Sequence, residues 1–215
     1  MSPLTKLVKL INMLNNNGGT ENMLELNLEK PANGLGLNLT KTDPTLKNVL
    51  GVLKWDMNNT HSGDFDMDIW AFVMKRQGED DILSCGSDVI YWDQKSHPTG
   101  AVSIPFDSRD GSKEELINVS LDKVPADRDV AAVNVFLHKA AERKQTFGMI
   151  SNASFSLANA DTNNGIVNYK INQFVSETAL HIGNFVRRQD GWHFDPEGAA
   201  AALAEQDVVN LYYRG

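Results

Sequence analysis

Three aspartates alternate with apolar residues in the segment HSGDFDMDIWAFVMK, residues 61–75. Asp64, Asp66 and Asp68 are two residues apart, so on an extended strand they share one face with about 6.6 Å between neighbours. Like charges at that spacing repel one another unless solvent or a cation offsets the repulsion. Two converging carboxylates can hold one Ca²⁺ ion at about 2.4 Å from each oxygen. The spacing suits a cation site if the chain curves around Asp64 or if more than one ion is held.

A second acidic segment, FDSRDGSKEEL, follows at residues 106–116. Its carboxylates are Asp107, Asp110, Glu114 and Glu115. Hard cations take six to eight oxygen ligands, which is more than one short segment offers. We therefore expect the two acidic segments to converge, with backbone carbonyls and water completing the shell.

Neither acidic segment follows the EF-hand pattern. Counted from Asp64, that pattern needs Gly and Glu where this chain has Ile69 and Lys75. Solvated acidic turns that only keep the surface soluble remain an alternative explanation for both segments.

The apolar residues around the aspartates predict where the acidic cluster lies. Phe65, Met67 and Ile69 take the face opposite the aspartates and should point into the core. Beyond Asp68 the aspartate face itself becomes apolar, beginning with Trp70. The acidic cluster is therefore predicted at the rim of the fold, at the start of a buried strand.

Short alternating segments joined by polar turns recur along the chain and predict an all-β, antiparallel β-sandwich with few short helices. The strand candidates are MLELNLE, GLGLNLT, VLGVLKW, IWAFVMK, DVIYW, AVSIPF, LINVSL, VAAVNVFLH, ASFSLA and GIVNYKI, followed by a hairpin of LHIGNFVRR and WHFD around QDG. Helical turns are expected at 139–147 and, because alanines follow Pro196, at 196–207 near the C-terminus.

The first 19 residues are expected to form an N-terminal amphipathic helical extension and a flexible joint, NNNGG, ahead of a main domain at 20–215. Lysines interrupt the apolar run and no small-residue cleavage site follows, so a signal peptide is not expected. No apolar stretch approaches the ~20 residues that a transmembrane helix needs. We expect a cytoplasmic protein without a transmembrane segment.

Composition narrows the classes of partner and site. The 215-residue chain is 41% hydrophobic and 22% charged with a net charge of -8, which argues against nucleic-acid binding. The single cysteine, Cys85, excludes an intrachain disulfide and is expected to be a small strand hydrophobe. The five histidines have no zinc-ligand spacing. His138 ends the strongest strand candidate, VAAVNVFLH, and is expected to be a hydrogen-bonded structural histidine.

Three blocks of the chain resemble the TerD family of tellurite-resistance proteins. KWDMNNTHSGDFDMDIWAF resembles that family's G-W-D…D-x-D-L-D-A-S-A-F segment. LDKVPADRDVAAVNVFLHKAAERKQTFGMISNASFSLAN resembles its K-V-P-A-D…I-H-x-A…R-x-Q-x-F-G-x-V-x-N-A-F-I-R-L-x-N block. SETALHIGNFVRRQDGWHF is similar to S-T-E-T-A…G-E-L-Y-R-H…W-K-F, so the resemblance spans residues 22–195 in order.

The resemblance implies a Ca²⁺-binding β-sandwich from tellurite-, phage- and colicin-resistance operons, with no established catalytic activity. Family metal sites use the D-x-D-x-D segment, which falls here on Asp64, Asp66 and Asp68, and an acidic glycine-rich loop. Asp107 and Glu115 match that loop by position, and Asp110 and Glu114 are further candidates. Here PFDSRD replaces the opening of that loop, and its glycine-rich run is shortened to GSKEE. We therefore expect one good Ca²⁺ site and a weaker second one.

These patterns predict a non-enzymatic calcium-binding protein whose acidic loops are ordered by the ion and presented to a protein partner. Other tellurite-resistance proteins are candidate partners, and self-association through the N-terminal helix is a further possibility. Two alternatives stay open. One is a Mg²⁺-dependent phosphotransferase or nuclease using the same aspartates, although the sequence offers no positioned lysine, general base or basic groove. The other is a metal-free structural interaction module.

Overall fold

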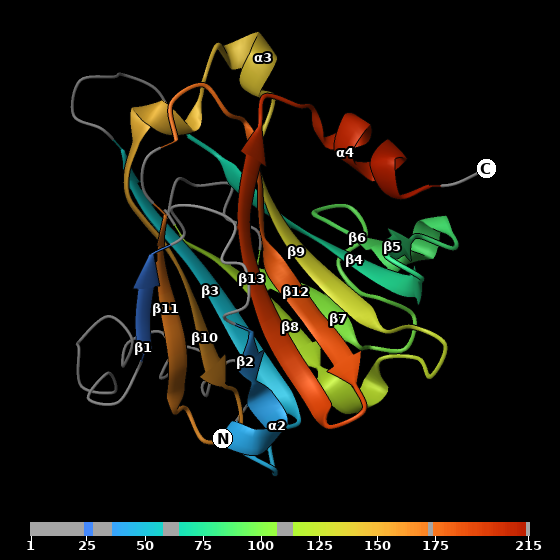
Figure 1. The fold of residues 1–215 in the computed structure, drawn as a ribbon. Coiled ribbons are helices and arrows are strands. Elements are labelled where there is room, and N and C mark those ends of the chain that lie inside the picture. The colour runs from blue at the N-terminus through green and yellow to red at the C-terminus, as the bar shows by residue number, and fades with distance from the viewer. Residues whose placement is uncertain (1–23, 28–35, 58–64, 107–113, 172–173, 214–215) are drawn as a thin grey trace.

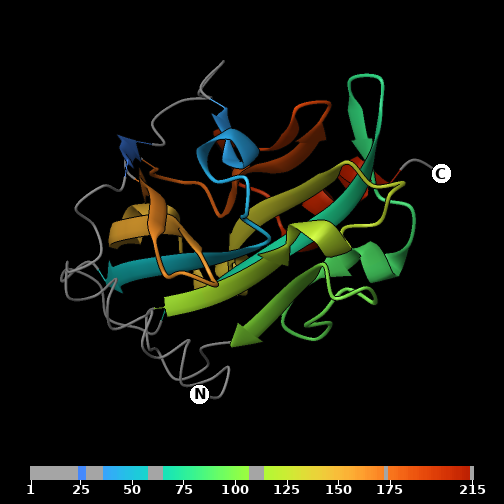
Figure 2. The ribbon, with the colours of Figure 1, turned by 90° about the horizontal axis from the view of Figure 1, so that it is seen from below.

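The computed structural model describes residues 24–27, 36–57, 65–106, 114–171 and 174–213. These residues form two β-sheets packed face to face, as Figure 1 and Figure 2 show. The first sheet has the order β1-β11-β10-β3-β8-β7 and consists of β1 (Leu24–Asn27), β3 (Asn48–Met57), β7 (Val102–Phe106), β8 (Glu114–Ser120), β10 (Ile150–Asn159) and β11 (Gly165–Ile171).

The second sheet has the order β2-β13-β12-β9-β4-β5, and β6 also pairs with β4. Its strands are β2 (Leu37–Asn38), β4 (Met67–Gln77), β5 (Asp80–Ile82), β6 (Val89–Ile90), β9 (Val130–Leu137), β12 (Ala179–Arg188) and β13 (Gly191–Ala201). Strand pairs are antiparallel except for β1, which runs parallel to β11. The predicted antiparallel sandwich is confirmed.

Helices are short and few in the described part of the chain, as predicted. They are α2 (Leu39–Thr42), α3 (Ala140–Arg143) and α4 (Glu205–Tyr212), with 3₁₀ turns at Gly86–Asp88, Leu121–Lys123 and Phe147–Met149. None of these helices has the length and apolar character needed to cross a membrane. The predicted N-terminal helical extension and its joint, residues 1–19, lie outside the described residues.

The main hydrophobic core lies between the two sheets. Phe65, Met67 and Ile69 are all buried there, so the predicted inward face of the aspartate segment is confirmed. Burying a side chain of this size stabilises the fold by about 1.5–3 kcal/mol. This packing fixes the start of β4 and with it the backbone that carries the aspartates.

A second cluster explains why β4 is apolar on its other face as well. Phe72 and Met74 point outward from the sandwich and pack with Phe136 of β9. Val208 and Val209 of α4 cover them, so the C-terminal helix shields the outer face of the second sheet (Figure 1).

The C-terminal helix begins later than the predicted range 196–207. Pro196 and the first alanines instead continue β13, which runs to Ala201 and pairs with β12, while α4 begins at Glu205. Pro196 lies beyond the two positions where β2 pairs with β13, so its missing N–H interrupts no pairing with β2. Cross-strand pairing has overridden the helix propensity of alanine.

Three smaller expectations were also wrong. In the described part of GLGLNLT, residues 36–40, only Leu37–Asn38 is a strand, and the chain then turns into α2, where the Asn38 side chain accepts a hydrogen bond from Lys41 N–H at 2.7 Å. DVIYW contributes only the two residues of β6. Cys85 is exposed and precedes a 3₁₀ turn, so it is not a buried strand residue.

Candidate metal site

Asp66 and Asp68 lie where β4 begins, and this is also where β9 ends. Met67 pairs with Leu137 in the register of the two strands, and the N–H of His138 donates to the carbonyl of Asp66 at 2.9 Å. The register therefore places both aspartates beside His138 at the end of the molecule that carries α3 (Figure 1).

Asp68 is a buried acid. It is only 4% exposed, and its Oδ2 lies 3.2 Å from Nδ1 of His138. A carboxylate that loses this much solvent must be compensated by hydrogen bonds or by positive charge. The sequence did not predict that His138 lies against an aspartate, and the hydrogen bonding expected of its side chain stays a prediction. Only the register of β4 against β9 places His138 beside Asp68.

Glu115 reaches the same segment from the opposite sheet. It is 2% exposed, and its Oε2 accepts a hydrogen bond from the backbone N–H of Ile69 at 2.6 Å. Within the described residues, β6 pairs with β4 only at Ala71 and Phe72, so β6 does not extend to Ile69. The carboxylate of Glu115 thus satisfies a backbone donor that no strand covers, and the predicted convergence of the two acidic segments is seen at Glu115.

Glu114 lies against a different partner. It faces Lys54 across the β3–β8 pair, with 3.7 Å between Nζ and Oε2. Burial raises the pKa of Glu114, and the ammonium of Lys54 works in the opposite direction. Since neighbouring residues on a strand point to opposite faces, Glu115 rather than Glu114 turns toward β4.

Asp64, Asp107 and Asp110 lie outside the described residues. Among the residues that the structure does describe, no three His, Cys, Asp or Glu side chains are grouped closely enough to hold a metal. Asp66 and Asp68 of the second sheet and Glu115 of the first offer carboxylate oxygens, which is the ligand type that Ca²⁺ prefers. The donor type fits a hard cation, and a full shell needs ligands beyond the described part of the chain.

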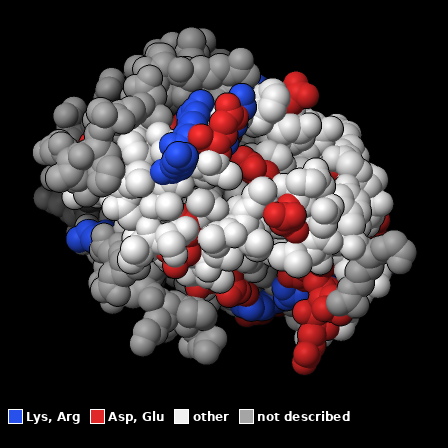
Figure 3. Space-filling model, turned by 90° about the horizontal axis from the view of Figure 1, so that it is seen from above, with Lys and Arg blue, Asp and Glu red and all other residues white. Residues whose placement is uncertain are grey.

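The described surface at this end carries no continuous basic area. Figure 3 views it from above: on the described surface, Asp and Glu side chains form separate groups and Lys and Arg side chains lie in small groups, mostly beside them. Such a surface lacks the positive stripe that nucleic-acid backbones require.

A second buried polar cluster, which the sequence did not reveal, surrounds Asp88. Asp88 is 2% exposed and accepts hydrogen bonds from the backbone N–H groups of Ser84 and Cys85 and from Nη2 of Arg128, each at 3.2 Å. Its other oxygen lies 3.3 Å from Nε2 of His97. Both carboxylate oxygens are engaged in holding the loop between β5 and β7, so the cluster is structural.

The sequence and the fold were compared with those of known proteins. Residues 24–212 match the TerD domain. The tellurium resistance protein TerD of Alcaligenes sp. is 32% identical over 183 residues, covering 83% of this chain and 94% of that protein. General stress protein 16U of Bacillus subtilis (strain 168) is 34% identical over 173 residues, covering 78% and 88%. A crystal structure of a telluride resistance protein (TerD) homologue from Streptomyces coelicolor A3(2) has the same fold, with a TM-score of 0.64, 21% identity and coverage of 76% and 95%.

Proposed function

The chain belongs to the TerD domain family, and on that premise we propose that it is a non-enzymatic calcium-binding protein of the tellurite-resistance and stress-response class. Relatives that share about a third of its residues are named for tellurium resistance and for general stress. The resistance or stress role is carried over from those names, and the calcium role rests on the acidic residues of this chain.

The observation that carries the calcium proposal is that the carboxylate of Glu115 reaches β4 at the backbone N–H of Ile69, the residue that follows Asp68. Asp68 comes from the second sheet and Glu115 from the first, and each is almost fully removed from solvent. Asp66 precedes Asp68 by two residues, so the two side chains share one face of the strand. These three, with Asp64, Asp107 and Asp110 from the neighbouring segments, would hold the ion.

A bound cation would supply positive charge where the chain has gathered carboxylates. The described residues contribute the preorganisation: the core packing of Met67 and Ile69 holds β4, and the Glu115 contact ties it to β8. Ion binding would then order the acidic segments that follow β3 and β7. We propose that this ordered surface is what a protein partner recognises, with other tellurite-resistance proteins as candidates and the cytoplasm as the compartment.

Titration calorimetry with Ca²⁺ on metal-stripped protein tests this proposal. We expect saturable binding, and a loss of about tenfold or more in affinity for Asp66→Asn and for Asp68→Asn, because each change removes a charged ligand. Asp80→Asn is the matched control, since Asp80 lies in β5 at the far end of β4 and should leave the titration unchanged.

Two results would overturn the assignment of these ligands. One is a titration of the unaltered protein that shows no heat of Ca²⁺ binding. The other is unchanged affinity in both aspartate variants, provided that far-ultraviolet circular dichroism shows them folded. Equal affinity for Mg²⁺ would instead favour a small octahedral site of the kind that phosphoryl-transfer enzymes use.

A further inference from the structure

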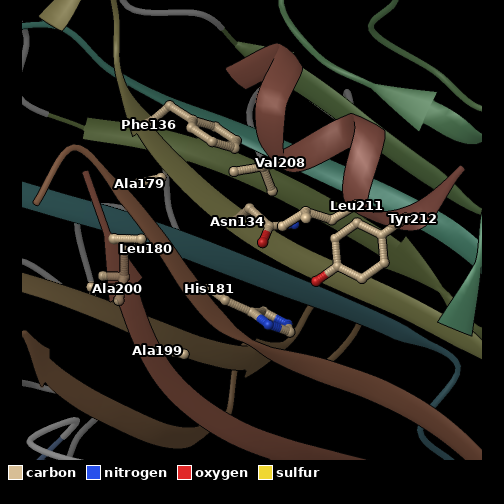
Figure 4. Close-up of a pocket in the computed structure, with 11 residues that line it drawn as sticks. Asn134, Phe136, Ala179, Leu180, His181, Ala199, Ala200, Val208, Leu211 and Tyr212 are labelled. Atoms are coloured by element: carbon tan, nitrogen blue, oxygen red, sulfur yellow. The ribbon is translucent and has the colours of Figure 1, made fainter. Parts of the chain in front are cut away.

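A pocket whose lining includes none of the candidate cation ligands lies between α4 and the outer face of the second sheet (Figure 4). Its volume is about 170 Å³. The lining comes from β9, β12, β13 and α4, namely Asn134, Phe136, Ala179, Leu180, His181, Ala199, Ala200, Ala201, Val208, Leu211 and Tyr212. A cavity of about 150 Å³ suffices for a benzene ring, so this space suits one ring-sized molecule.

Small side chains on two adjacent strands create the space. Ala179 pairs with Ala201, and His181 pairs with Ala199, across the β12–β13 ladder. Larger residues at these alanines would reach up to α4 and fill the gap. Leu211, which is 68% exposed, stands at the rim and leaves the pocket open to solvent.

Asn134 is the feature that points to a ligand. It is the one polar residue of β9, VAAVNVFL, and it is 1% exposed. Its Nδ2 group has no hydrogen-bond partner among the described residues, yet the side chain lines the pocket. A buried donor left without a partner is rare in folded proteins because its desolvation is not compensated. An acceptor in the pocket would complete it.

The other polar groups of the pocket favour an uncharged guest. His181 Nε2 lies 3.0 Å from Oδ1 of Asn184, and burial lowers the pKa of His181, which favours the neutral imidazole. Burial raises the pKa of Tyr212, and the carboxylates of Asp81 and Glu197 raise it further. No Lys or Arg is among the described residues that line the pocket, so an anion bound there would be desolvated without a positive partner in the lining.

Figure 4 shows how these groups are arranged. Asn134, His181 and Tyr212 lie around the same space under α4, while Phe136, Val208 and the alanines supply apolar walls. Apolar walls with a few placed polar groups are the usual composition of a small-molecule site.

We propose that this pocket binds a compact, uncharged, ring-sized organic molecule that carries a carboxamide or lactam edge. The carbonyl oxygen of that edge accepts a hydrogen bond from Nδ2 of Asn134, and the ring lies against the alanines and Val208. This site is separate from the cation site and does not depend on the proposed calcium function.

Nicotinamide is the test probe, because it joins a single ring to a neutral carboxamide, and nicotinate is its anionic counterpart. In ligand-observed saturation-transfer NMR with the full chain, we expect saturable nicotinamide binding in the millimolar range. We expect nicotinate to bind about tenfold more weakly or not at all. Backbone amide shifts in β9, β12 and α4 should locate the site.

Variants separate this site from adventitious binding. Asn134→Leu removes the donor at nearly constant size, and Ala199→Leu fills the floor from an exposed position; each should weaken nicotinamide binding about tenfold or more. Val175→Ser, on an exposed residue that does not line the pocket, should bind nicotinamide as the unaltered chain does. The proposal would be overturned if the unaltered chain showed no saturable nicotinamide binding. It would also be overturned if Asn134→Leu and Ala199→Leu bound nicotinamide as tightly as the unaltered chain.

Discussion

Two buried carboxylates at the acidic end of this protein each have an identified contact. Asp68 is held against His138, and Glu115 accepts the N–H of Ile69. Removing one partner of such a buried pair costs more than the pair itself contributes, because the remaining charge keeps its desolvation penalty. These contacts therefore set which carboxylates can be exchanged without loss of the fold.

Tyr169 is a buried hydroxyl for which the opposite result is expected. It is 1% exposed, its hydroxyl has no hydrogen-bond partner among the described residues, and burial raises its pKa. Tyr169→Phe keeps the ring against Phe194 and removes the unsatisfied oxygen. Urea unfolding should give a free energy of unfolding equal to or above that of the unaltered chain. A loss of more than about 1 kcal/mol would mean that the hydroxyl has a partner that stabilises it.

His181 should make stability depend on pH. Burial lowers the pKa of His181 below its ordinary value of about 6.5, so the unfolded chain takes up this proton more readily than the folded one. The free energy of unfolding therefore carries no penalty from His181 above pH ~6.5. It falls as the pH drops through that value toward the lower pKa of the folded state.

The comparison of His181→Gln with the unaltered chain isolates this effect. Between about pH 7 and pH 5 the variant should lose less free energy of unfolding than the unaltered chain, because it lacks the titrating ring. Urea unfolding at several pH values measures both slopes. If the free energy of unfolding changed equally with pH in the two proteins, the burial of His181 would not be the cause.

At the scale of elements, α4 is predicted to be a required cover of the second sheet. Val208 and Val209 bury the outward-facing Phe72, Met74 and Phe136. Deleting residues 204–215 should lower the free energy of unfolding by roughly 3–6 kcal/mol for the two valines alone. Binding of a hydrophobic dye should rise as the sheet face is exposed. Deleting only the last two residues is the control, and an unchanged unfolding midpoint in the long deletion would contradict this role.

The sequence predicted the strands well where one periodicity dominated. Alternation located β3, β8 and β11, and continuous apolar runs located β4 and β9, since these bury both faces. It failed at 196–207, where β12 supplies pairing that outweighs the helix propensity of alanine. It failed at Cys85 as well, where a turn organised around Asp88 replaces the expected strand.

The candidate metal site could be predicted as residue types but not as a set of contacts. The D-x-D-x-D spacing indicated a rim position at the start of a buried strand, and Asp66 and Asp68 lie there. The choice of Glu115 over Glu114, and the position of His138 against Asp68, depend on sheet register and on which face of β8 turns inward. Neither can be read from local sequence, because register is set by pairing with distant strands.

At the scale of the whole molecule, the fold separates two regions with different chemistry. Carboxylates gather at the end where β4 begins and β9 ends, while the pocket under α4 is lined by uncharged side chains. The net charge of -8 adds general repulsion that a bound divalent cation would reduce. The proposed calcium function therefore predicts a gain in the stability of the entire sandwich and not only a local change.

The melting temperature of metal-stripped protein with and without calcium tests this claim most directly. A ligand that binds only the folded state at a hundredfold excess over its Kd adds about 2.7 kcal/mol, which for a domain of this size raises the Tm by roughly 5–10 °C. We predict such a rise with Ca²⁺ and a much smaller one with the same concentration of Mg²⁺. Superimposable melting curves in chelator and in saturating calcium would contradict the account.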